Sequence, residues 1–140
     1  MTADTYLSQI KLLEILLERK RDKIERLQDK DDYRGIDYSN IKIKGKSPIV
    51  DNMAEGIALK DELARELKQD YSRIFYKRET IIKNIEQIEN VYTYSVIYDH
   101  YVNGLSLQDI AERESHSKNW AKLHREKGLA IIQDIIDIRT

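Results

Sequence analysis

Three basic residues, Lys118, Lys122 and Arg125, recur at spacings of four and three near the end of this chain. On a helix these spacings place the side chains on one face, so the three cations would form a single stripe. Asn119 lies at the edge of that stripe. Lysine attracts phosphate, arginine can bind guanine with two hydrogen bonds, and asparagine can bind adenine in the same way. The alternative is an ordinary solvated helix face, which carries such charges without binding a ligand.

A short helix, a turn and a second helix are predicted around this stripe. Ser106 is a good N-cap for the first helix, in which Ile110 and Ala111 face inward. Residues 115–117 form the turn, and Ser117 caps the second helix. Because Ala111 is small, the two helices can approach closely, as a helix-turn-helix requires. In that motif the first turns of the second helix reach base edges, and here those turns carry the cations.

The opposite side of the second helix is apolar. At about 100° per residue, it collects Trp120, Ala121, His124, Gly128, Ile131, Ile132 and Ile135. Its expected partners are Ile97 and Tyr101, on a helix over residues 93–102, and Ile110, on the short helix that follows it. We interpret Trp120 as a core anchor rather than a wedge into DNA. Gly128 costs roughly 1 kcal/mol of helix propensity relative to alanine, and either loosens the helix or permits closer packing.

Two long helices are predicted before this module. The first, over residues 4–31, carries a heptad seam of Ile10, Leu13, Leu17, Lys20, Ile24 and Leu27. The second, over residues 51–89, repeats the rhythm at Met53, Ile57, Lys60, Ala64, Leu67, Tyr71, Ile74, Arg78, Ile81, Ile85 and Ile88. Residues 32–50 lose the period and contain Pro48, so we expect a long, mobile loop there. The seams either pair antiparallel within one chain or pair between two copies.

The composition favours an all-α protein. Charged residues make up 35% of the chain, more than the roughly 25% of a typical globule, and there is a single proline. The net charge of −1 gives no overall basic field, and the lack of cysteine excludes disulfides and thiolate metal sites. No apolar run approaches the roughly 18 residues that span a membrane, and the first residues do not resemble a secretory signal. We therefore expect a soluble, cytoplasmic protein with no membrane partner.

The sequence shows no pattern for catalysis or cofactor binding. His100, His116 and His124 lack the spacing of zinc ligands, and the five glycines are isolated, so no phosphate-binding loop exists. Carboxylate pairs such as Glu62 and Glu66 lie among lysines and arginines, which is typical of a solvated helix face. We expect neither an enzyme nor a metal or cofactor site.

Residues 101–111, Tyr-Val-Asn-Gly-Leu-Ser-Leu-Gln-Asp-Ile-Ala, together with residues 117–129, resemble region four of sigma factors. They are still more similar to small phage and prophage regulators of the ArpU and RinA type, and the resemblance covers about the last third of the chain. It implies a helical N-terminal half, a sigma-region-four-like C-terminus, and regulation of late phage operons in a bacterial host cell. By that resemblance the first turns of the recognition helix contain Ser117, Lys118, Asn119 and Lys122, and Gln108 lies near the DNA backbone.

We therefore expect a coiled-coil-like helical hairpin over 1–89 and a helix-turn-helix domain over 90–140. The expected function is sequence-specific binding of double-stranded DNA by a transcriptional regulator, an activator of phage or prophage late genes. The hairpin would mediate a homodimer or contact RNA polymerase. Two alternatives stay open. One is a DNA-packaging component like a terminase small subunit, although those usually place the DNA module first; the other is a helical adaptor that does not bind DNA.

Overall fold

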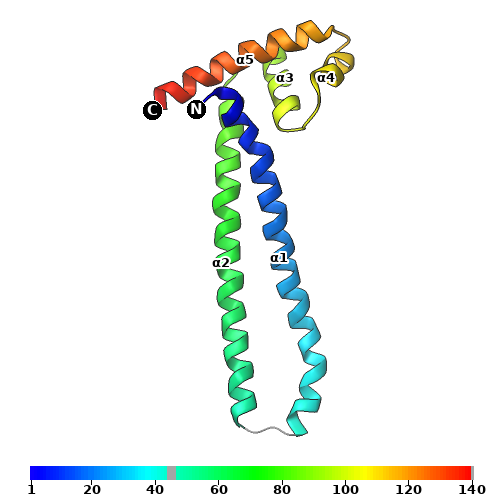
Figure 1. The fold of residues 1–140 in the computed structure, drawn as a ribbon, viewed down its shortest axis with the longest axis vertical. Coiled ribbons are helices and arrows are strands. Elements are labelled where there is room, and N and C mark those ends of the chain that lie inside the picture. The colour runs from blue at the N-terminus through cyan, green and yellow to red at the C-terminus, as the bar shows by residue number, and fades with distance from the viewer. Residues whose placement is uncertain (44–46, 140) are drawn as a thin grey trace. The chain divides into compact units, whose positions relative to one another are not determined.

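The computed structural model describes the backbone of residues 1–43 and 47–139, and their side chains except those of residues 29–55 and 57. Within this part the chain is entirely α-helical between its turns (Figure 1). The helices are α1 (Ala3–Ile43), α2 (Ser47–Ile85), α3 (Val91–Tyr101), α4 (Leu107–Arg113) and α5 (Lys118–Arg139). The all-α prediction is confirmed. None of the described helices combines the length and the hydropathy that crossing a membrane requires.

The first two helices differ in extent from the prediction. α1 continues beyond residue 31 to Ile43, and α2 begins at Ser47, so the loop expected over 32–50 is wrong wherever the backbone is described. Residues 44–46 lie outside the described residues. The single glycine of residues 32–43, Gly35, costs a helix only about 1 kcal/mol. Pro48 stands in the first turn of α2, where its missing N–H needs no partner.

The chain divides into two compact units, Met1–Ile15 with Phe75–Thr140 (the first unit) and Leu16–Ile74 (the second unit). In the first unit the beginning of α1 and the end of α2 share a core with α3 and α5. The apolar residues of that core are Ala3, Leu7, Ile10, Ile81, Ile82, Ile85, Ile88, Ile97, Tyr101, Val102 and Ile132.

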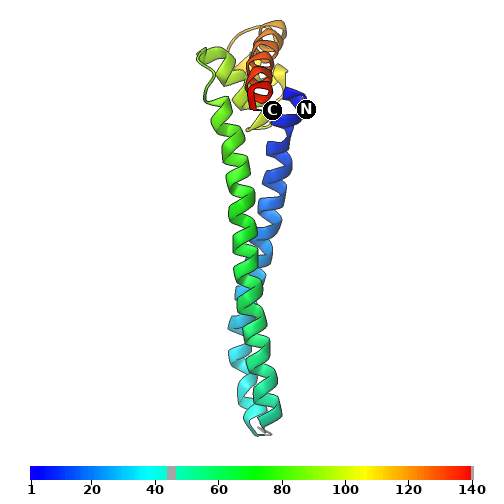
Figure 2. The same cartoon turned by 90° about the vertical axis from the view of Figure 1, so that its left-hand side faces the viewer.

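Within the first unit, α1 and α2 lie side by side and antiparallel, as Figure 2 shows. The Asn84 amide donates to the Tyr6 hydroxyl oxygen at 2.6 Å, and the Arg78 guanidinium donates to the Glu14 carboxylate at 2.9 Å. The second unit has the same antiparallel order: the Lys20 ammonium lies 3.5 Å from the Asp70 carboxylate, and the later Leu27 lines a groove with the earlier Leu63. The seams therefore pair within one chain.

The heptad seams predicted for the two helices are confirmed. Every seam residue whose side chain is described is buried or half-buried. The polar seam residues Lys20 and Arg78 are accommodated because each forms an ion pair with the facing helix. Met53 and Ile57 lie outside the described side chains.

Local capping determines where α3 begins and ends. The Asn90 side chain accepts hydrogen bonds from the N–H groups of Tyr92 and Thr93, at 3.0 and 3.1 Å, so Asn90 caps the beginning of α3. After α3 the chain reverses at Gly104, whose φ of +73° lies in the left-handed region that glycine tolerates.

The predicted core face of α5 is largely confirmed. Ala121, His124, Gly128 and Ile132 are buried, and Ile135 is half-buried. Ile131 is 37% exposed, and its core assignment is wrong, because it lies at the edge of the face. At Gly128 an added Cβ would lie 2.6 Å from Ile97 Cδ1 and 3.3 Å from Thr93 Cγ2. Gly128 therefore permits α5 to approach α3 closely, which was one of the two interpretations left open by the sequence.

Candidate nucleic-acid interface

The turn between α4 and α5 is fixed by backbone hydrogen bonds. Ser115 has a left-handed φ of +57°. The His116 N–H donates to the Ala111 carbonyl at 2.8 Å, and the Ser115 N–H donates to the Glu112 carbonyl at 3.2 Å. These two bonds form a Schellman motif, which satisfies carbonyls that the end of α4 would otherwise leave unpaired. The predicted turn over 115–117 is confirmed.

Serines cap the helices on both sides of this turn. The Ser106 hydroxyl accepts from the Asp109 N–H at 3.1 Å and caps α4. The Ser117 hydroxyl accepts from the Trp120 N–H at 3.2 Å and caps α5. Below the turn, Ile110, Ala111 and Ala121 are at most 1% exposed. Because two of these three side chains are single methyl groups, α4 and α5 can pack closely. The capped beginning of α5, residues 117–119, is exposed to solvent.

Four of the six predicted DNA-binding residues come together at the beginning of α5. Ser117, Lys118, Asn119 and Lys122 are all exposed. Asn119 lies on the side of α5 opposite to the buried Gly128, since nine residues correspond to about 180°. Gln108 is exposed on α4, where its amide donates to the Glu112 carboxylate at 3.1 Å.

Arg125, the sixth predicted residue, has an intramolecular partner. Its guanidinium Nη2 lies 3.1 Å from the Asp4 carboxylate of α1, and its side chain is only 27% exposed. The Tyr101 hydroxyl donates to the same carboxylate oxygen at 2.6 Å, and the Arg125 Nε is buried without a hydrogen-bond partner. The beginning of α1 therefore borders the cationic stripe at Arg125, and the open part of the stripe consists of Lys118 and Lys122.

Electrostatics stabilise this Asp4–Tyr101–Arg125 junction. The Tyr101 hydrogen bond, followed by the Arg125 charge, lowers the pKa of the Asp4 carboxyl below its usual value, against the opposing effect of burial. Burial, together with the hydrogen bond to Asp4, raises the pKa of Tyr101 to about 12. The phenol therefore stays protonated at neutral pH and keeps donating to Asp4.

An apolar residue on the exposed face was not identified from the sequence. Leu123 is 50% exposed and lies about 40° around α5 from Asn119. Its position next to Lys122 on the polar side of the helix is the signal in the sequence that could have identified it. A leucine here can contact the methyl group of thymine.

Trp120 does not belong to the main core, so its interpretation as a core anchor is corrected. Its ring stacks on His116 with centroids 4.1 Å apart and packs edge-on against Tyr92 and His124. His124 is itself buried, with its Nδ1 2.9 Å from the Thr93 hydroxyl, and burial lowers its pKa. This aromatic cluster joins the turn to α3 and holds the beginning of α5 in place.

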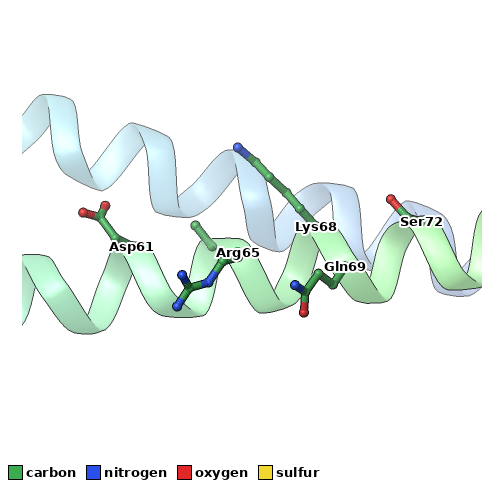
Figure 3. A pocket seen from close by; sticks show the side chains of 6 residues that line it. Asp61, Arg65, Lys68, Gln69 and Ser72 are labelled. Atoms are coloured by element: carbon green, nitrogen blue, oxygen red, sulfur yellow. The ribbon is translucent and has the colours of Figure 1, made fainter.

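Among the described side chains, no group of three His, Asp or Glu residues is placed to hold a metal ion. A shallow groove along α2 is lined by Asp61, Ala64, Arg65, Lys68, Gln69 and Ser72, with polar side chains that point away from the helix (Figure 3). All six residues come from one helix, and charged side chains of both signs lie among polar ones, as on a solvated face.

No family model matches this chain, and no curated protein or solved structure matches it significantly.

Proposed function

We propose that this protein is a sequence-specific DNA-binding transcriptional regulator, with α4 and α5 as its helix-turn-helix and α5 as the recognition helix. One observation carries the proposal: the Ser117-capped beginning of α5 presents Lys118, Asn119 and Lys122 to solvent while Ala121, between them, is fully buried. A recognition helix needs this division, because one side must pack on the helix before it and the other must enter the major groove.

Each exposed group has a distinct role in the proposed complex. Lys118 and Lys122 neutralise phosphates, and the positive end of the α5 dipole attracts the same groups. Asn119 hydrogen-bonds an adenine edge, and Leu123 contacts a thymine methyl. Gln108 contacts the DNA backbone from α4 and fixes the register.

The biological setting of the proposal comes from the resemblance to ArpU- and RinA-type regulators. On that basis the protein activates late genes of a phage or prophage in the cytoplasm of a bacterial host. The long helices α1 and α2 would then contact RNA polymerase or a second copy of the chain.

The test is binding to a DNA duplex selected from a random library, measured by fluorescence anisotropy over a range of salt concentrations. Asn119→Ala should reduce the binding free energy for the selected duplex by about 1–3 kcal/mol and relax the sequence preference at one base pair. Lys118→Ala and Lys122→Ala should weaken binding to all sequences, and each should reduce the salt slope by about 0.9 for every chain bound to the duplex. Lys127→Ala is the matched control, because Lys127 is exposed on the same helix about 140° around from Lys122.

A different outcome would favour a different function. If no sequence is enriched, and the protein shows no salt-dependent binding, the cationic stripe does not contact phosphate. The α4–α5 module would then be a protein-docking element, as in the helical adaptor alternative.

A further inference from the structure

Among the described side chains of the second unit, Leu16–Ile74, the exposed large apolar residues gather on one side. Leu16 is 45% exposed on α1, and Leu59 and Leu63 are 66% and 46% exposed on α2. The half-buried Leu27 and the buried Leu67, both seam residues, lie with Leu63 around a groove to which both helices contribute. We call these five residues the leucine face. Single exposed leucines are common on protein surfaces, but a set contributed by two helices to the same face is typical of an interface.

Helix geometry places the leucine face opposite the polar groove of Figure 3. At about 100° per residue, Ser72 and Asp61 lie about 180° and 160° around α2 from Leu63. The two sides of the second unit therefore differ in chemistry. A hairpin that needed only to be soluble would gain nothing from exposing leucine on one side.

The two borders of the leucine face carry opposite charges. On α1 the border consists of Arg19, Lys23 and Arg26, all exposed, and the last two also line the groove. On α2 the border at the level of the groove consists of Glu62 and Glu66, which are exposed as well. Farther along the same border, Arg73 forms an ion pair at 2.9 Å with Asp70 of its own helix. A partner whose charges had a single sign would be attracted by one border and repelled by the other.

We propose that the leucine face binds the leucine face of a second copy of this chain, so that the two second units form a two-fold symmetric, antiparallel four-helix bundle. A two-fold axis parallel to the helices places α1 of each copy on α2 of the other. Within one chain Lys20 is level with Asp70. At that register Lys23 and Arg26 of one copy face Glu66 and Glu62 of the second copy, and symmetry forms the same contacts twice. This inference does not depend on DNA binding.

The oligomeric state of the full-length chain tests the proposal, measured by sedimentation equilibrium. The wild type should be a dimer. Lys23→Glu with Arg26→Glu, or Glu62→Lys with Glu66→Lys, should each place like charges opposite one another and raise the dimer dissociation constant at least about tenfold. All four positions are exposed in the chain, so circular dichroism should show unchanged helix content.

A mixture of the two charge-reversed variants provides the decisive control. In a mixed dimer both borders are complementary again, so the mixture should form dimers as readily as the wild type although each variant alone does not. Restored association also shows that both variants are folded. A monomeric wild type, an assembly larger than a dimer, or a mixture that stays monomeric would overturn the proposal.

Discussion

Gly128→Ala should destabilise the first unit although alanine is the better helix former. The substitution gains about 1 kcal/mol of helix propensity. Against this gain, the new methyl group would lie 2.6 Å from Ile97 Cδ1 and within contact of Ile97 Cγ1 and Thr93 Cγ2. Ile97 is 0% exposed, so its side chain has no open space to enter. Overpacking of this kind costs about 1–3 kcal/mol, and the contact with two atoms of one buried side chain places Gly128→Ala toward the upper end.

The expected net effect of Gly128→Ala is a loss of about 1–2 kcal/mol in the free energy of unfolding. Urea denaturation followed by Trp120 fluorescence measures it, because Trp120 is the chain's one tryptophan and belongs to the same unit. Gly56→Ala is the matched control: Gly56 is also helical, but a Cβ there would meet nothing within 4 Å. Gly56→Ala should therefore stabilise α2 by up to about 1 kcal/mol in the free energy of unfolding, measured by urea denaturation followed by circular dichroism.

The sign of the Gly128 effect decides the interpretation. If Gly128→Ala is as stable as the wild type or more stable, α5 does not approach α3 as closely as the structure shows. The orientation that α5 would need in a DNA groove would then have to come from the aromatic cluster around Trp120 instead.

Three further changes test single interactions. Asp4→Asn should lower stability at neutral pH, because Tyr101 and Arg125 depress the pKa of the Asp4 carboxyl in the folded state. That contribution is present above the ordinary pKa of 3.8 and is lost as pH falls through the lower folded value. The unfolding free energies of wild type and variant should therefore converge in acid, and a constant difference would refute the ion pair. The wild type should lose stability below pH 6.5, because burial lowers the pKa of His124 in the folded state and only the unfolded chain readily takes up the proton. His124→Gln should show a smaller loss over the same pH range, and equal pH slopes for the two proteins would contradict this. Ser117→Ala should cost about 1 kcal/mol in urea denaturation through loss of the α5 cap, Ser117→Asn much less, and equal losses would exclude capping.

Much of the fold could be predicted because its determinants are local. Ser106 and Ser117 cap helices through hydrogen bonds to residues three positions away, and such signals can be recognised in the sequence. The heptad seams are equally local, since a residue's place on a helix face depends only on spacing. The extent of α1 beyond residue 31 was missed, because the loss of apolar period was interpreted as the loss of helix.

The junction at Arg125 could not be predicted in the same way. Spacing places Arg125 on the same stripe as Lys118 and Lys122, but it does not tell which other element lies beside that stripe. Asp4 is 121 residues away and belongs to a different helix, so no period connects the two. The same limitation applies to Gly128, whose contribution depends on the position of Ile97 across the interface between α5 and α3.

The pairing of Arg125 with Asp4 connects the two proposals in a measurable way. It leaves two lysines at the beginning of α5 for phosphate contacts, and each neutralised phosphate contributes about 0.9 to the salt slope of binding. One chain should therefore show a slope of about 2 and a dimer on a paired site a slope of about 4.

The two charge-reversed variants of the leucine face should bind the selected duplex with about half the wild-type slope. They change the net charge in opposite directions, so a shared reduction reflects the loss of the dimer rather than a general electrostatic effect on DNA. Restoration of the full slope in the mixture would show that dimerisation supplies the second set of contacts. If the monomeric variants keep the wild-type slope, DNA is bound by one chain at a time, and the leucine face serves a purpose separate from DNA recognition.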